Sequence, residues 1–209
     1  QALIAAMEER ADPFQARLRG LFGRHHLDAA GSDRLISGFR GRTGVVVGDV
    51  VIDTYVLCDR AEVAGESAIL SLRPTDRRSF DGGAAIIAQH LAALGARPIL
   101  VTVLPRSLES ERMRRRLADR GIEVRSIECD RPIVEKQRFL VGAQKVMKLD
   151  LGQRIDLDAT QRERLHEIAS DASRGADAAI VADFALGLLA PASIGPLCRA
   201  LRSNVGVLA

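Results

Sequence analysis

Two carboxylates follow a run of β-branched residues that is bounded by glycine. The run, residues 44–49, predicts a strand that is buried on both faces. Asp49 ends this strand, and Asp53 follows four positions later. Ligands of open parallel sheets bind outside the carboxyl ends of the strands. A carboxylate at this place accepts two hydrogen bonds at once and suits a vicinal diol of a sugar. Asp49 fits a turn cap equally well, whereas a functional role is favoured for Asp53, because it lies among apolar neighbours, where a charge needs a reason.

A pair of glycines, Gly82 and Gly83, opens a segment of small apolar residues with helical period. The helix predicted over 82–94 presents free N–H groups at its start, and glycine lets a ligand come close to the backbone there. Such a place suits hydroxyl groups or an anion. Glycines at a helix start also occur for packing alone, and this alternative stays open.

Two cations and a further carboxylate complete the set of candidate binding residues. Lys136 and Arg138 are predicted to share one face of a strand, because side chains alternate along it. Two cations on one face suit a phosphate on the substrate, and the alternative is a solvated edge strand protected by its charges. Asp183 ends another buried strand, where it would contact a ligand or a metal ion, or else cap a helix.

The elements that must position these residues alternate between buried strands and helices. This alternation predicts an α/β fold with a parallel sheet that is covered by helices on both faces. Two segments, 52–73 and 132–150, each look like a pair of strands with mixed polarity, which predicts a separate, small antiparallel sheet. The other strands are predicted at 44–49, 98–103, 124–127, 178–182 and 205–208, and the helices at 82–94, 108–120, 157–173 and 193–202.

Residues 1–40 have a different pattern, with apolar residues at helical spacing. A helix is predicted to begin at Pro13, because proline suits a first helical turn, and residues 31–33 are predicted to form a loop before a further helix. We expect residues 1–40 to be a helical appendage or a linker, and residues 41–209 to be the main domain. Since the sequence begins with Gln1, we also expect further residues upstream.

Composition narrows the class of protein. Of the 209 residues, 47% are hydrophobic and 3% aromatic, and the net charge is +3, so we expect a large core and no charge-driven binding of nucleic acid. The basic run 112–116 is interpreted as a solvated helix face. No apolar run is long enough for a membrane span, and three cysteines without a CxxC pair suggest reduced thiols in the cytoplasm. The motifs of hydrolase triads, zincins and Walker-A loops are absent.

Taken in order, these segments resemble the ribokinase-like (PfkB-type) carbohydrate kinases, and within them the heptose-phosphate kinase branch, as in bifunctional heptose kinase/adenylyltransferases. The resemblance covers roughly residues 43–209. The family's motifs are GD-x-x-x-D-x-Y, GGAA, K-x-R, a strand that ends in a basic residue followed by L-D, and an aspartate between a small residue and an aromatic. They match Gly48 to Tyr55, Gly82 to Ala85, Lys136 with Arg138, Lys148 to Asp150, and Ala182 to Phe184 with Gly187 nearby.

The resemblance implies a ribokinase-like fold in which the two strand pairs form a lid over the sugar and a possible homodimer contact. Asp53 and the backbone of Gly82 and Gly83 would hold sugar hydroxyls, and Lys136 and Arg138 a phosphate already on the sugar. The implied reaction transfers the γ-phosphoryl group of ATP to a sugar hydroxyl with the help of Mg²⁺. The implied partner is a small sugar or sugar phosphate, and neither nucleic acid nor a membrane.

The family's catalytic aspartate lies in a C-terminal G-A-G-D motif, and neither this motif nor the nucleotide-binding segments occur in the sequence. We therefore expect an incomplete kinase that is inactive by itself. Ile86 and Leu186 stand where heptose kinases carry an asparagine and a lysine. One alternative is a non-catalytic sugar-binding or regulatory module with a degenerate kinase fold. Another is a Rossmann-type nucleotide binder, which would need a G-x-G-x-x-G motif that the sequence lacks.

Overall fold

The computed structural model describes residues 13–25, 28–63 and 70–209. The chain divides into two compact units between Arg40 and Gly41. The described part of the first unit contains helices α2 (Pro13–Arg24) and α3 (Ala29–Ser37). Helix α2 begins at Pro13, as predicted, while the helical pattern of residues 1–12 lies outside the described residues. The role of residues 1–40 as an appendage or a linker stays a prediction.

The predicted loop at residues 31–33 is wrong, because these residues lie inside α3. The helix begins earlier, where the side chain of Asp28 accepts a hydrogen bond from the backbone N–H of Gly31 at 2.6 Å. This N-cap satisfies one of the free donors of the first turn. A single glycine inside a helix costs only about 1 kcal/mol, so the cap outweighs the turn signal.

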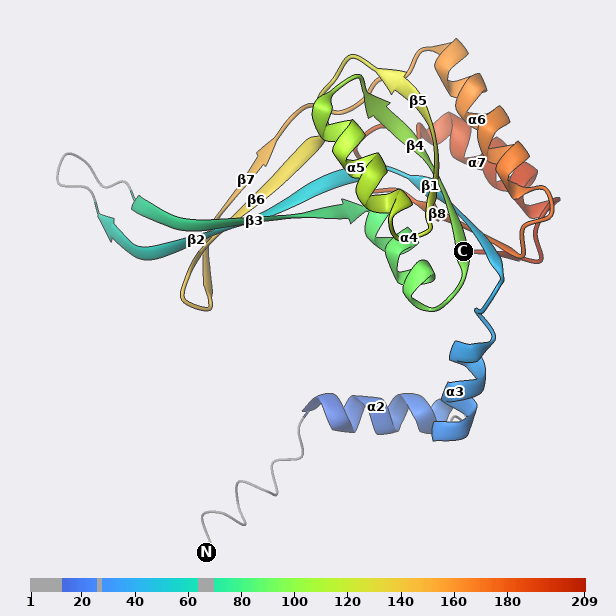
Figure 1. Ribbon diagram of the computed structural model, residues 1–209, viewed down its shortest axis with the longest axis horizontal. Coiled ribbons are helices and arrows are strands. Elements are labelled where there is room, and N and C mark those ends of the chain that lie inside the picture. The colour runs from blue at the N-terminus through green and yellow to red at the C-terminus, as the bar shows by residue number, and fades with distance from the viewer. Residues whose placement is uncertain (1–12, 26–27, 64–69) are drawn as a thin grey trace, which may run out of the picture. The chain divides into compact units, whose positions relative to one another are not determined.

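The second unit is built on a five-stranded sheet in the order β5-β4-β1-β8-β9 (Figure 1). All neighbouring strands in it are parallel, which confirms the predicted parallel sheet. The strands are β1 (Thr43–Gly48), β4 (Arg97–Pro105), β5 (Glu123–Cys129), β8 (Ala178–Ala182) and β9 (Val207–Leu208).

Helices cover both faces of this sheet. Along β1, Val46 belongs to a core shared with α4 (Ala84–Ala93) and α5 (Leu108–Ala118). Val45 and Val47 belong to the opposite core, shared with α6 (Ala159–Ser173) and α7 (Pro191–Arg202). Because successive side chains point to opposite faces and both faces are buried, the strand reads as an unbroken apolar run.

A second sheet extends from the carboxyl ends of the core strands, in the order β3-β2-β6-β7 (Figure 1). Its strands are β2 (Val50–Val63), β3 (Leu70–Gly83), β6 (Val134–Val141) and β7 (Gln144–Leu151). We call this four-stranded sheet the lid. It corresponds to the two predicted strand pairs, although β3 continues to Gly83 and so delays the start of α4 by two residues.

The prediction of an antiparallel lid needs correction, because the lid is mixed. The pairs β2–β3 and β6–β7 are antiparallel, but β2 and β6 run parallel at the centre. Strand β2 follows the carboxyl end of β1, and β6 follows the carboxyl end of β5. Since β1 and β5 point the same way in the core sheet, the strands that leave them also run outward in the same direction.

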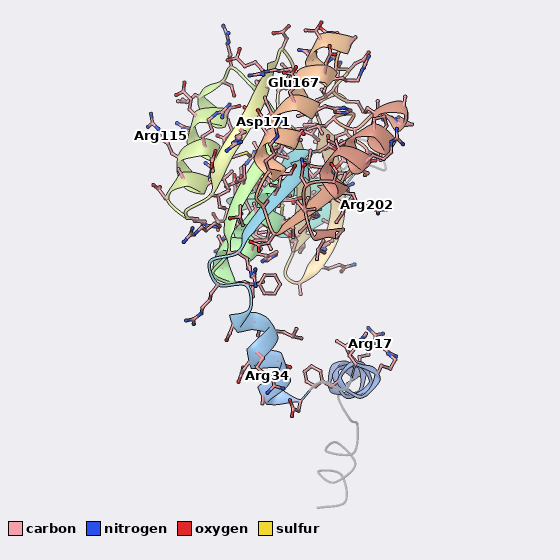
Figure 2. The ribbon with its side chains drawn as sticks, turned by 90° about the vertical axis from the view of Figure 1, so that its right-hand side faces the viewer. Arg17, Arg34, Arg115, Glu167, Asp171 and Arg202 are labelled. Carbon is pink, nitrogen blue, oxygen red and sulfur yellow. The ribbon has the colours of Figure 1, made fainter. Side chains whose placement is uncertain are left out.

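The ends of the helices follow ordinary capping chemistry. Asp158 caps α6, and with Gln161 it forms a reciprocal capping box. The outer faces carry charged side chains, among which Arg115 on α5, Glu167 and Asp171 on α6 and Arg202 on α7 project from the ribbon (Figure 2). Among the described residues, no helix combines the length and the apolar character needed to cross a membrane.

Candidate functional site

Three predicted binding residues lie together on one face of the lid. In the ladder between β2 and β6, Asp53 pairs with Lys136, and Tyr55 pairs with Arg138. The guanidinium of Arg138 donates to Oδ1 of Asp53 at 2.5 Å and lies 5.6 Å from the centroid of the Tyr55 ring. The hydrogen bond to Asp53 raises the pKa of Arg138. The face therefore combines one carboxylate with two cations, as the sequence predicts for Lys136 and Arg138.

The glycine pair lies against this cluster. A Cβ at Gly82 would overlap Oδ2 of Asp53, and a Cβ at Gly83 would overlap the backbone oxygen of Asp49. Gly83 also has a φ of +63°, a conformation that side-chain-bearing residues rarely adopt. The two glycines let the end of β3 come within contact of β2, which is consistent with the packing alternative. Their contact with sugar hydroxyls stays a prediction. The backbone N–H of Ala84, which follows, donates to the Asp49 oxygen at 2.8 Å.

Asp49 lies below the surface, with 1% of its area exposed. Its carboxylate accepts backbone hydrogen bonds from Phe184 at 3.1 Å, from Leu186 at 3.4 Å and from Leu188 at 3.1 Å. Burial raises the pKa of Asp49, and these hydrogen bonds oppose the rise. All three donors belong to the loop after β8. The geometry therefore favours the turn-cap alternative over direct contact with a sugar.

Asp183 begins the same loop and is exposed. Its Oδ1 accepts a hydrogen bond from the backbone of Ala185 at 2.8 Å, and Ala185 has a φ of +58°. The alternative of a helix N-cap is wrong, because α7 begins only at Pro191. None of the hydrogen bonds or ion pairs of the described residues joins Asp183 to Asp53 or Arg138. Its contact with a ligand stays a prediction.

The loop after β8 also contacts the connection between the lid and α6. The backbone N–H of Ile155 donates to the oxygen of Leu186 at 2.6 Å. Gly187 has a φ of +102°, and a Cβ there would overlap the backbone oxygen of Ile155. The loop thus joins the buried carboxylate of Asp49 to the base of the lid.

An ion pair that sequence reasoning missed fixes the end of β3 to α5. Asp81, with 6% of its side chain exposed, accepts two hydrogen bonds from Arg116, at 3.0 Å from Nε and 2.6 Å from Nη2. The hydrogen bond to Asp81 raises the pKa of Arg116. The interpretation of the basic run as a solvated face holds for Arg112 and Arg115, which are exposed. The sequence contained one signal for this ion pair, which was Asp81, because a carboxylate beside a buried glycine turn needs a cation.

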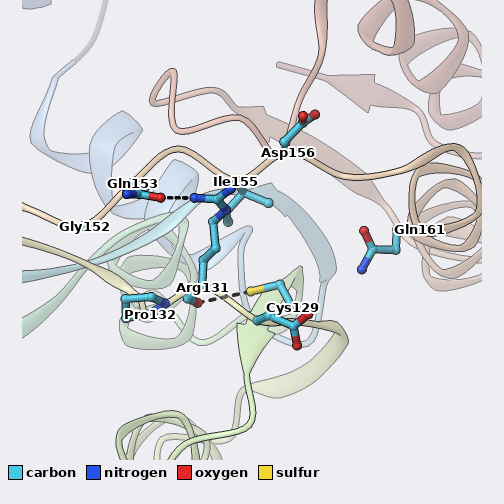
Figure 3. Close-up of a pocket in the computed structure, with 9 residues that line it drawn as sticks. Cys129, Arg131, Pro132, Gly152, Gln153, Ile155, Asp156 and Gln161 are labelled. Carbon is cyan, nitrogen blue, oxygen red and sulfur yellow. Dashed lines mark hydrogen bonds between the residues drawn. The ribbon is translucent and has the colours of Figure 1, made fainter.

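A cavity of about 850 Å³ lies where two connections join the lid to the core (Figure 3). Arg131 donates to the side chain of Gln153 across it, and Sγ of Cys129 donates to the backbone oxygen of Arg131 at 3.3 Å. None of the predicted binding residues lines this cavity. The cluster around Asp53, and not this cavity, therefore remains the candidate site.

No protein-family model matches the chain. Two curated relatives are bifunctional proteins named HldE. The one from Koribacter versatilis is 31% identical over 151 residues, which is 72% of this chain and 31% of that protein. The one from Methylobacillus flagellatus is 32% identical over 150 residues, which is 69% of this chain and 30% of that protein. The chain thus spans about a third of the length of these relatives.

A solved structure with the same fold is phosphofructokinase-2 from Escherichia coli in complex with fructose-6-phosphate. It superposes with a TM-score of 0.62 at 16% identity, and the match covers 80% of this chain and 54% of that chain. The superposition confirms the predicted fold.

Proposed function

We propose that this chain, a homologue of the HldE proteins with the fold of ribokinase-like (PfkB-type) carbohydrate kinases, binds the acceptor sugar of an ATP-dependent carbohydrate kinase. The observation that carries the proposal is the cluster of Asp53, Lys136 and Arg138 on one face of the lid. It lies against the glycine turn, at the carboxyl end of the parallel sheet, where open α/β folds bind ligands.

The charges of the cluster suit a sugar phosphate. A carboxylate such as Asp53 accepts hydrogen bonds from two hydroxyl groups. Within the described residues Lys136 makes no ion pair, and its charge is available to a phosphate together with that of Arg138. The ion pair with Asp53 holds Arg138 in place before the substrate arrives, which lowers the entropic cost of binding.

The proposed phosphoryl donor is ATP, and Mg²⁺ would neutralise the charge of its phosphates. Among the described residues, no group of three or more His, Cys, Asp or Glu side chains could hold a metal ion. The alternative of a non-catalytic module is not favoured, because the solved neighbours carry the names of kinases.

A cytoplasmic location is part of the proposal. All three cysteines, Cys58, Cys129 and Cys198, are free thiols. Free thiols are typical of compartments that keep cysteine reduced. The test is to add an oxidant and measure the melting temperature. If the oxidant formed a disulfide and raised the melting temperature, the cytoplasmic assignment would be contradicted.

Replacement of Asp53 by asparagine tests the proposed site. We expect sugar phosphate to bind roughly 10- to 150-fold more weakly, because a hydrogen bond to a charged group contributes about 1.5–3 kcal/mol. Isothermal titration with fructose 6-phosphate, glucose 6-phosphate and sedoheptulose 7-phosphate measures the affinities. Asp76→Asn is the matched control, since Asp76 is an exposed lid carboxylate that pairs with Arg78. Equal affinities for the two variants would refute the site.

We also propose a homodimer through the lid. Met147, Leu149 and Leu151 are each 41% exposed and recur at strand period on β7. Leu149 pairs with Gln137, which alternates with Arg138, so this apolar stripe lies on the face opposite the candidate site. Exposed apolar stripes of this kind mark interfaces.

The dimer is tested by Leu149→Glu. Light scattering after size exclusion should give twice the chain mass of 22.6 kDa for the unsubstituted protein and a monomer for the variant, because a charge would be buried in the interface. Leu108→Glu on α5 is the control, since Leu108 is also exposed. A monomeric unsubstituted protein would rule out the dimer.

A further inference from the structure

An aromatic side chain lies exposed beside Asp53. Phe80 is the cross-strand partner of Asp53 in the ladder between β2 and β3, and 55% of its area is exposed. Directly opposite residues of such a ladder have Cβ atoms about 5 Å apart. A ligand held by the Asp53 carboxylate is therefore within reach of the Phe80 ring.

Phe80 is also part of a connected row of side chains. Its ring meets that of Tyr55 edge to face, with centroids 6.0 Å apart and an interplanar angle of 78°. Tyr55 lies beneath the guanidinium of Arg138, and Arg138 bonds to Asp53. The edge-to-face contact fixes the ring orientation of Phe80. An oriented ring thus borders the charged cluster, with more than half of its surface open.

We propose that Phe80 is a substrate-binding residue, against which the C–H-rich face of the acceptor sugar packs while Asp53 holds its hydroxyls. This inference rests on the proposed function and deepens it. The proposed role of Phe80 implies that the ligand is a cyclic sugar phosphate, one face of which carries clustered C–H groups. An open-chain polyol phosphate should bind less well. A sugar ring suits this place because it offers hydroxyls at its edge and apolar hydrogens on a face.

A second protein chain fits this face less well. The centres of protein interfaces are depleted in charged residues, but Phe80 lies next to Asp53, with Lys136 and Arg138 on the following strand. The apolar stripe of β7 lies on the opposite face of the lid. Phe80 is therefore not continuous with the surface that we assign to a dimer.

The sequence allows a direct optical test, because the chain contains no tryptophan. Phe80→Trp keeps an aromatic ring at the site and makes it the only tryptophan. We expect its emission to change saturably with fructose 6-phosphate, glucose 6-phosphate or sedoheptulose 7-phosphate, and not with inorganic phosphate. Leu108→Trp on α5 places a tryptophan at an exposed position away from the lid as a control. Its emission should not change.

Phe80→Ala gives the energetic test. We expect about tenfold weaker binding of the sugar phosphate that the unsubstituted chain binds best, because the apolar contact is lost. We expect the melting temperature to fall by at most a few degrees, because more than half of the ring is exposed and only one edge-to-face contact is lost. Ribitol 5-phosphate, an open-chain polyol phosphate, should lose less affinity than the ring sugar in the same variant.

The outcomes separate the two levels of the proposal. If the unsubstituted chain binds none of the three sugar phosphates, the proposed function fails, and this inference fails with it. If the unsubstituted chain binds one of them but Phe80→Ala binds it equally well, the proposed function stands and the role of Phe80 is refuted. A tryptophan emission that follows protein concentration instead of sugar would assign Phe80 to a protein contact and would also refute it.

Discussion

Replacement of Asp49 by alanine is expected to lower the free energy of unfolding by about 2–4 kcal/mol. Three backbone N–H groups of the loop after β8 donate to this carboxylate, that of Leu188 in a buried hydrogen bond and the other two in partly buried ones. A buried donor left without a partner costs about 1–3 kcal/mol. The alanine variant no longer has the desolvation cost of a buried carboxylate, which offsets part of this loss. Because the same loop bonds to Ile155 at the base of the lid, we also expect weaker sugar binding.

Urea unfolding of the variant measures this loss. Asp183→Ala is the matched control, since Asp183 is an exposed aspartate of the same loop that accepts one backbone hydrogen bond, and its loss should stay within about 1 kcal/mol. Asp49→Asn should fall between the unsubstituted protein and Asp49→Ala, because the amide keeps one acceptor. Similar losses for the two alanine variants would mean that the loop does not depend on Asp49.

The pH dependence of the same series gives an independent check. Burial raises the pKa of Asp49 above its usual value of 3.8, so the folded state holds this proton more tightly than the unfolded state does. The stability that the protonated group contributes is present below pH 3.8 and is lost as the pH rises through the raised pKa. The stability of the unsubstituted protein minus that of Asp49→Asn should therefore fall with rising pH in this range. A rise would contradict the buried, desolvated carboxylate.

The sequence predicts the core sheet well, for a physical reason. Strand β1, for example, is buried on both faces, so its local composition already reflects its environment. The direction in which β2 and β6 pair is not a local property. It depends on which core strands they leave, and the sequence pattern of each segment is the same for a mixed and for an antiparallel lid.

The candidate site shows the same limit. Asp49 and Asp53 differ by four positions and both follow β1, but only the fold shows that the donors to Asp49 come from residues about 135 positions away. Likewise, Arg115 and Arg116 are neighbours in a basic run, and only Arg116 meets Asp81. Strand alternation, which is local, correctly placed Lys136 and Arg138 on one face.

Substitution of Gly83 by alanine is expected to cost about 2–6 kcal/mol of unfolding free energy. Two effects add. The φ of +63° and ψ of −134° are strained for a residue with a side chain, which costs about 1–3 kcal/mol. The new Cβ would also overlap the backbone oxygen of Asp49, and relieving that overlap moves backbone, which costs a further 1–3 kcal/mol or so.

Gly121→Ala separates these two effects. Gly121 has a φ of +73°, but a Cβ there would meet no atom within 4 Å, so this variant carries backbone strain alone, about 1–2 kcal/mol. Urea unfolding of both variants gives the difference, which measures how tightly the glycine turn is packed against β2. Because Gly82 touches Asp53 in the same turn, Gly83→Ala should also weaken sugar phosphate binding, and Gly121→Ala should not. Equal losses of stability would mean that the turn has room for a side chain, and the close approach of β3 to Asp53 would then not need its two glycines.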